Sequence, residues 1–449
     1  MNLRSVSMRI SLGLVLIFAS ILNISFSQRC YENIVRKEIR SLNSNEWSVY
    51  ESTINLLHRK GILEKFAYIH AEYFKYVHGT REFLPWHRKF VLEFENVARS
   101  YNPEYVQPYW DVSIDFSNPT LSPVFSPSRM GGNGVGDNRC IRTGMQSGWI
   151  NVYPDDKCLR RSFNNGDTIN PFLSPESISS DIQISKNFEE FAKRIETGIH
   201  NQVHDAIGGD MDGKQSPLDG IFMLHHANID RIWWMFQNVR DSNMMSYSGD
   251  LLEEIKYYNN SVESLMKIGE GDLCYDYQFS GYVNKSKVKD GISNTDLDRI
   301  LKIPEMSLIN GLSKKNLKRF FPTLFSGYAD KNSLDMTDYI SKKAIKYSKF
   351  RLNITGANKD LVVFEKNRTN VSYNSKIQES LISYSKNRKF GYSLKSKIEW
   401  KPRMPYPSMA SKEMVLNHRL DPIFYKEYYK EKYALVDALN ADGYVSPYI

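Results

Sequence analysis

Histidine is the residue type whose spacing in this sequence best suits chemistry. Of the nine histidines, eight fall between residues 58 and 226, and the ninth is His418. His200 and His204 stand four apart in a segment with a helical pattern, so both side chains lie on one face of a helix, where they can bind one metal ion together. The adjacent pair His225–His226, in the next predicted helix, offers a third ligand.

A second histidine set is looser in sequence and consists of His70, His78 and His87. A helix is predicted to carry the first of these, a short loop the second, and the start of another helix the third. Three imidazoles per site, without a carboxylate at matching spacing, suit copper better than iron, magnesium or calcium. Three histidines also suit a catalytic zinc ion, but the duplicated set favours two adjacent metals. The sequence therefore predicts a pair of copper ions.

A buried histidine outside such a group is more often a packed core residue than a ligand. We interpret His58, His225 and His418 in this way.

Helices must position the imidazoles, and apolar periodicity predicts them at the right places. The pattern predicts helical structure over 46–76 with a break near Gly61, over 85–95 with Pro85 in the first turn, over 188–207 with an end at Gly208–Gly209, and over 219–239. Four such helices predict a mainly α fold, an antiparallel four-helix bundle, and bundle cores commonly hold metal pairs.

Longer stretches of the sequence resemble the copper-binding signatures of the tyrosinase family. Residues 83–95 are similar to the first signature, and residues 198–204 and 219–233 to the second. Residues 274–277, Cys-Tyr-Asp-Tyr, resemble the tyrosine motif that closes the catalytic domain. The resemblance covers residues 30–277, and it implies a type 3 dicopper protein like the tyrosinases, catechol oxidases and hemocyanins.

The resemblance also implies a role for each histidine, with molecular oxygen as co-substrate. The first copper ion would be bound by His70, His78 and His87, and the second by His200, His204 and His226. In the double histidine the family uses the later member, so His225 would be a neighbour. Three further residues would hold the ligand side chains in position without binding copper themselves: Asp219, Phe222 and Asn228. For Phe222, plain core packing is the alternative.

A phenol must lose a proton before it binds copper, and its unperturbed pKa is about 10. In the family an acidic residue and an asparagine hold a water that takes this proton, and Glu196 and Asn201 stand at those positions. Glu196 could instead be an ordinary solvated helix charge, and Asn201 could orient the ring of the preceding histidine.

The expected activity depends on this pair. If both residues act on the proton, the enzyme hydroxylates monophenols and oxidises o-diphenols to o-quinones, for pigment formation or for protein cross-linking. The substrates would be phenolic small molecules or tyrosyl and dopa side chains of secreted proteins. A catechol oxidase without monophenolase activity, a hemocyanin-like oxygen carrier and a matrix protein without chemistry remain alternatives.

Two positions depart from the family pattern. Many relatives have a cysteine two residues before the second ligand, joined covalently to it, and this chain has Tyr76 there. This lowers the likeness to molluscan oxygen carriers and to plant and fungal catechol oxidases. The usual Asp-Pro before the last signature is Asp219–Gly220 here, which frees the helix start somewhat.

The start of the chain predicts secretion. Residues 1–27 combine Arg4 and Arg9 with an apolar run over 10–22 and small residues before a cleavage site, which is typical of a signal peptide and too short for a membrane anchor. An even number of cysteines in a secreted chain suggests two disulfides. Cys140 with Cys158 would close a short loop, and Cys30 with Cys274 would join the two ends of the catalytic domain; other pairings remain open.

Beyond the signal peptide we expect a catalytic domain over 28–284 and a C-terminal region over 285–449, with a strand near 361–364 and a helix over 425–433. In the family such an extension often covers the copper site, so this region either shields the site or is a separate binding module. Glycosylation sequons lie at Asn259, Asn284, Asn353, Asn367 and Asn370. The net charge of +8 is spread along the chain, which argues against a nucleic-acid partner.

Overall fold

The computed structural model describes Cys30 and residues 34–278, 308, 311–329, 403–446 and 448–449. Several predictions lie outside the described residues: the signal peptide, the domain boundary at 284/285, the strand near 361–364, and the sequons at Asn284, Asn353, Asn367 and Asn370. Asn259 is described and exposed. None of the helices in the described ranges combines the length and the apolar character needed to cross a membrane.

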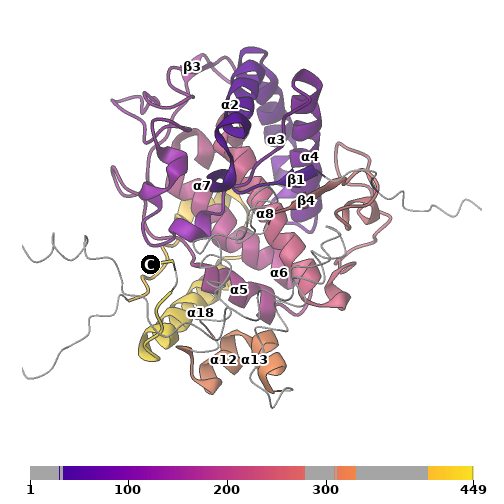
Figure 1. Cartoon of the computed structure of the whole chain (residues 1–449), viewed down its shortest axis with the longest axis vertical. Coiled ribbons are helices and arrows are strands. Elements are labelled where there is room, and N and C mark those ends of the chain that lie inside the picture. Colours follow the sequence, from indigo (N-terminus) through magenta and orange to yellow (C-terminus); the bar gives the residue numbers. More distant parts are fainter. Residues whose placement is uncertain (1–29, 31–33, 279–307, 309–310, 330–402, 447) are drawn as a thin grey trace, which may run out of the picture.

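The described chain is mainly helical, as predicted (Figure 1). Its α-helices are α2 (Ser44–Arg59), α3 (Ile62–Val77), α4 (Phe83–Tyr101), α5 (Pro175–Ile184), α6 (Phe188–Ile195), α7 (Asn201–Ile207), α8 (Ile221–Val239), α12 (Lys314–Phe320), α13 (Pro322–Ala329), α17 (Lys412–Asn417) and α18 (Pro422–Ala441). The strands are short: β1 (Ile34–Arg36), β2 (Ile150–Asn151), β3 (Lys157–Cys158) and β4 (Tyr275–Tyr277).

The predicted break near Gly61 is confirmed. Gly61 has a φ of 67° and separates α2 from α3, a conformation that glycine adopts without steric cost. At the other end of α2, the side chain of Asn43 accepts from the backbone of Glu46 and the side chain of Glu46 accepts from Asn43, a reciprocal cap that fixes where the helix begins.

The single helix predicted over 188–207 is wrong in one respect, because a π-helical turn, Glu196–His200, separates α6 from α7. Gly198 has non-helical angles there, with φ −88° and ψ −110°. A Cβ atom at Gly198 would lie 2.1 Å from the hydroxyl of Tyr428 in α18. The close approach of the C-terminal helix therefore requires glycine at this turn, and such turns are frequent at functional sites.

The segments near residues 30–36 and 274–277 meet. β1 pairs in parallel with β4, and the Cys30–Cys274 disulfide lies beside this pair. The hydroxyls of Tyr275 and Tyr277 donate to the buried carboxylate of Asp230 in α8.

The second expected disulfide, Cys140–Cys158, is also present, next to the antiparallel pair β2–β3.

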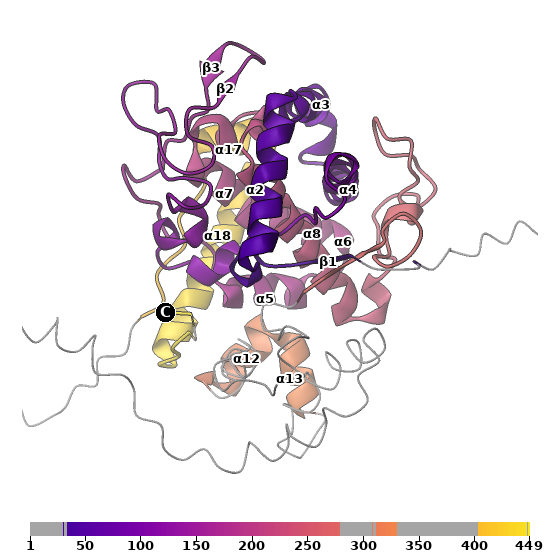
Figure 2. The same cartoon turned by 45° about the horizontal axis from the view of Figure 1, so that its top comes forward.

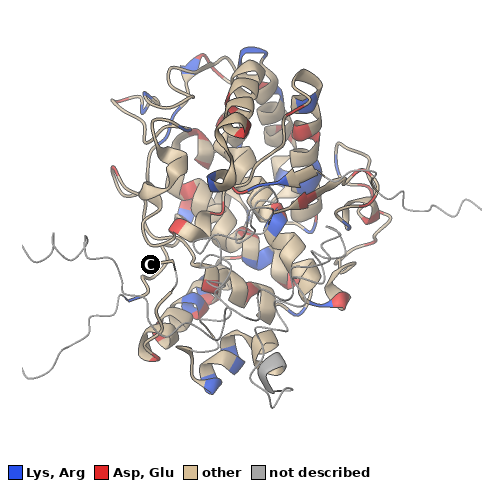
Figure 3. Ribbon diagram, viewed as in Figure 1, with Lys and Arg blue, Asp and Glu red and all other residues tan. Residues whose placement is uncertain are grey.

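Residues 403–446 and 448–449, here called the C-terminal segment, lie against the helices of the preceding part of the chain (Figures 1 and 2). Figures 1 and 2 show α18 beside α5, and Figure 2 shows α17 near α7. The helix predicted over 425–433 is confirmed within α18. Across the described elements basic and acidic residues are intermixed (Figure 3).

Candidate metal centre

Two sets of three imidazoles converge in the core. His70 in α3, His78 at the end of α3 and His87 in α4 form the first set. His200, His204 and His226, from the π-helical turn, α7 and α8, form the second set. In each set the three ligand atoms lie within 4.8 Å of one another, and no ring is more than 3% exposed.

The hydrogen bonds of the rings fix which nitrogen faces the centre. The Nδ1 atoms of five rings are paired with oxygen atoms at 2.6–3.1 Å: His70 with Lys214 O, His78 with Phe74 O, His87 with Phe83 O, His200 with Asn201 Oδ1 and His204 with Met211 O. A carbonyl oxygen can only accept, so each Nδ1 carries the proton and each Nε2 keeps a free lone pair.

The free nitrogens fit metal ions. The Nε2 atoms of His70, His87 and His200 are buried without a hydrogen-bond partner. Nε2 of His204 faces Nε2 of His226 at 3.3 Å. Buried polar atoms are rarely left without partners. In metal-binding histidines, one ring nitrogen binds the ion and the other donates a hydrogen bond that fixes the ring, which is the arrangement found here. Purely imidazole donor sets suit copper.

Burial keeps these rings uncharged. It lowers the pKa of His70 to about 3 and that of His204 to about 4. Burial also lowers the pKa values of His78, His87, His200 and His226 well below the usual range. Neutral imidazoles are the metal-binding form, so the protein presents them at neutral pH.

These pKa values predict that the metal-free protein loses stability in acid. Between the unfolded pKa of 6.5 and the folded values, the unfolded chain binds more protons, so the free energy of unfolding falls as the pH falls. His70 and His204 alone should each remove about 2 kcal/mol between pH 8 and pH 5. Urea unfolding of metal-free protein at both pH values measures this, and equal midpoints would contradict it.

The two adjacent histidines of α8, His225 and His226, have different surroundings. His226 belongs to the second set, and His225 lies outside both sets, as expected, and is fully buried. His58 stacks on Trp149 with ring centroids 4.0 Å apart, which is the packing role that we expected.

The three predicted supporting residues behave differently. Phe222 stacks on His226 with ring centroids 4.1 Å apart and meets His70 edge-on at 5.0 Å. Asp219 binds Arg161 through both carboxylate oxygens and accepts from the backbone of Ile221. It therefore fixes the start of α8, which lacks the usual proline. Asn228 accepts from Arg231, and within the described chain its amide nitrogen is buried without a hydrogen-bond partner.

Glu196 and Asn201 lie beside the histidine sets. Glu196 is 3% exposed, so its interpretation as a solvated charge is wrong; burial raises its pKa to about 8. Its carboxylate accepts from the backbone of Gly79, next to His78, at 2.8 Å. Asn201 Oδ1 accepts from Nδ1 of His200, so its side chain orients that ring, and its amide nitrogen is buried without a partner.

One histidine at the centre was missed by sequence reasoning. His418, interpreted above as a satisfied core residue, forms a third set with His78 and Glu196, again with ligand atoms within 4.8 Å of one another. It is isolated in the sequence, in the C-terminal segment, so no spacing pattern pointed to it.

Residues 60–239 match the family model described as the common central domain of tyrosinase. This range contains all six histidines of the first and second sets. This part of the chain is a tyrosinase central domain. The C-terminal segment, and with it His418, lies outside the match to this tyrosinase domain.

Curated tyrosinases are similar over about half of the chain. Tyrosinase ustQ of Aspergillus flavus is 28% identical over 288 residues, which cover 55% of this chain and 80% of that protein. The tyrosinase of Streptomyces antibioticus is 29% identical over 264 residues, covering 52% and 95%. Among solved structures, a polyphenol oxidase from Thermothelomyces thermophila matches 56% of this chain and 91% of that chain, at 21% identity and a TM-score of 0.45.

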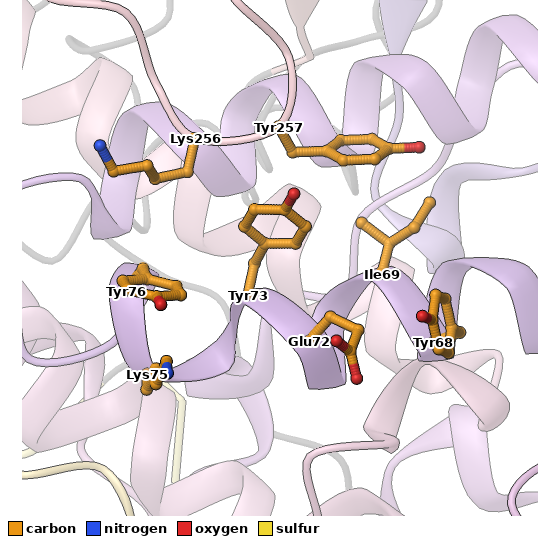
Figure 4. Close-up of a pocket in the computed structure, with 8 residues that line it drawn as sticks. All are labelled: Tyr68, Ile69, Glu72, Tyr73, Lys75, Tyr76, Lys256 and Tyr257. Carbon is orange, nitrogen blue, oxygen red and sulfur yellow. The ribbon is translucent and has the colours of Figure 1, made fainter.

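The departure at Tyr76 from the usual tyrosinase-family pattern places a phenol side chain on the surface. Tyr76 is 45% exposed and lines a surface pocket with other residues of α3 and with Lys256 and Tyr257 (Figure 4).

Proposed function

We propose that this tyrosinase-like phenol oxidase uses molecular oxygen to hydroxylate monophenols and to oxidise o-diphenols to o-quinones. The observation that carries the proposal is the convergence of two buried three-imidazole sets, in which the Nε2 atoms of His70, His87 and His200 have no hydrogen-bond partner. A monophenol and O₂ then give an o-quinone and water, and two o-diphenols and O₂ give two o-quinones and two waters.

The first set would hold one copper ion and the second set the other. Bound together, the two ions supply the electrons that activate O₂. The chain's own contribution is to hold six neutral imidazoles in place, five of them through Nδ1 hydrogen bonds and His226 through stacking on Phe222, and to keep the centre away from bulk water. Phe222 contacts rings of both sets and helps to hold the two sets in fixed positions relative to each other.

Glu196 and Asn201 are proposed to manage the phenol's proton. In the metal-free chain burial favours the protonated form of Glu196, and positive charge bound nearby would favour the carboxylate. The unpartnered amide nitrogen of Asn201 is a donor available to a water or to the substrate. Asn201 also orients His200, so the two roles that the sequence suggested are compatible.

The C-terminal segment is proposed to keep the enzyme latent. Its contacts reach the turn that carries His200 of the second set, where Tyr428 lies against Gly198, and His418 lies 4.9 Å from His78 between ring centroids. A phenol approaching the first set from this side would meet the segment.

The protein is further proposed to be secreted, with phenolic small molecules or tyrosyl and dopa side chains of secreted proteins as substrates, for pigment formation or cross-linking. N-terminal sequencing of protein recovered from the medium tests this. A mature chain that begins near Gln28 is expected, and an uncleaved chain retained in cells would contradict it.

Metal analysis and two assays test the activity. Purified protein, with the C-terminal segment removed by mild proteolysis, is expected to bind two copper ions per chain and to consume both L-tyrosine and L-DOPA. Consumption of L-DOPA alone would leave a catechol oxidase. Reversible oxygen binding without turnover would indicate an oxygen carrier, and zinc or a single metal would reject the dicopper centre.

A further inference from the structure

His418 is buried beside the metal centre although it comes from outside the catalytic domain. It ends α17 and is 4% exposed. Its ring meets those of His78 and Phe74 edge-on, with centroids 4.9 and 5.0 Å apart, and lies 5.7 Å from that of His200. A seventh imidazole is therefore placed among the six of the first and second sets.

The packing around His418 is not that of a satisfied core residue. Its Nδ1 atom is buried and has no hydrogen-bond partner. A buried polar atom without a partner costs free energy, so burial of this nitrogen without a bound ion is unfavourable. A metal ion would satisfy the free nitrogen.

The backbone at Gly79 allows the close approach of His418. Gly79 has a φ of 66°, and a Cβ atom there would lie 2.9 Å from the carbonyl oxygen of His418. The amide of the same glycine donates to Glu196 at 2.8 Å. Gly79 therefore donates a hydrogen bond to the Glu196 carboxylate and, because it has no side chain, leaves room for the backbone of His418.

We propose that His78, Glu196 and His418 form a third metal-binding set, which exists only while the C-terminal segment is closed. The proposal rests on the proposed function for the role of His78. Two imidazoles and one carboxylate are a donor set of divalent zinc sites, and copper(II) accepts the same donors. With metal–ligand distances of about 2.1 Å, two ligands of one ion lie at most about 4.2 Å apart, so ligand atoms that all lie within 4.8 Å of one another need at most small movements to bind one ion.

The third set competes with the first set for one residue. Nδ1 of His78 is engaged by the carbonyl of Phe74, so its remaining nitrogen serves one ion at a time. A metal bound by the third set therefore holds the C-terminal segment closed and withholds His78 from the first set. In this arrangement the ion itself contributes to latency.

The test measures how zinc changes the cleavage of the C-terminal segment in the full-length, metal-free protein. In the wild type, saturating zinc is expected to slow cleavage by at least about 10-fold, because an ion that binds the closed form lowers the open fraction. In His418→Phe, which keeps a ring at this position, the slowing should fall to the part that zinc bound at the first and second sets causes. His58→Phe removes a histidine away from the centre and should keep the full slowing.

The first and second sets are intact in His418→Phe, so general stabilisation by zinc at those sets remains in that variant. Equal slowing in the wild type and in His418→Phe would overturn the third set. That outcome would leave the dicopper proposal standing, because copper content and phenol oxidation are measured separately after the segment has been removed.

Discussion

Replacing His226 by asparagine is expected to remove one of the two copper ions and to lower L-DOPA oxidation by at least about 100-fold. Loss of residues that merely support metal ligands costs 10- to 100-fold, and loss of a ligand should cost no less. His226 faces His204 nitrogen to nitrogen and stacks on Phe222, so its ring is held at the centre of the second set. Copper per chain and the oxidation rate, both measured after removal of the C-terminal segment, check the result.

His225 provides the matched control. It is adjacent in sequence, equally buried and of the same residue type, but it lies outside both sets. His225→Asn should retain two copper ions and most of the activity, even if its thermal midpoint falls. Loss of copper from His225→Asn, with copper retained in His226→Asn, would show that the ligand assignment is wrong.

Much of this site could be predicted because its main determinants are local. His200 and His204 are joined by one helical turn, and Gly61 marks a helix break through its own conformational freedom. Apolar periodicity located α2, α3, α4 and α8 for the same reason. The disulfides followed from an even cysteine count, although the sequence alone left their pairing open.

The remaining features depend on contacts that leave little trace in local sequence. The acceptors for the ring nitrogens are mainly backbone carbonyls, such as those of Lys214 and Met211, and every residue type has such a carbonyl. The π-helical turn arises where Tyr428 approaches Gly198, a contact between distant parts of the chain. His418 was missed for the same reason, since only the folded segment brings it to His78.

A second large effect is expected from the ion-pair network that holds α18 in place. The carboxylate of Asp181 in α5 accepts from Lys432 at 2.6 Å and from Tyr428 at 2.9 Å. The side chains of Lys432 and Asp181 are 0% and 1% exposed. Arg194 in α6 binds Glu431 at 2.9 Å and approaches Asp181 at 3.3 Å. The network therefore joins α18 to the helix that precedes the second set.

Lys432→Met is expected to activate the full-length enzyme without proteolysis. Removing one partner of a buried pair costs about 3–5 kcal/mol, and the cost falls on the closed form because opening exposes Asp181 to water. A shift of about 3 kcal/mol raises the open fraction by about 100-fold. The rate of L-DOPA oxidation should rise toward that of the proteolysed enzyme, and the C-terminal segment should be cleaved faster.

Lys430→Met is the control, because Lys430 lies on the same helix but its side chain is 76% exposed, in an ion pair with Glu427. Exposed pairs contribute about 0–1 kcal/mol, so this variant should stay latent. If Lys432→Met unfolds, Tyr428→Phe removes a single hydroxyl bond to the same carboxylate and should give a smaller activation in the same direction. A folded Lys432→Met or Tyr428→Phe that is cleaved faster but no more active would show that the C-terminal segment does not limit access to the metal centre.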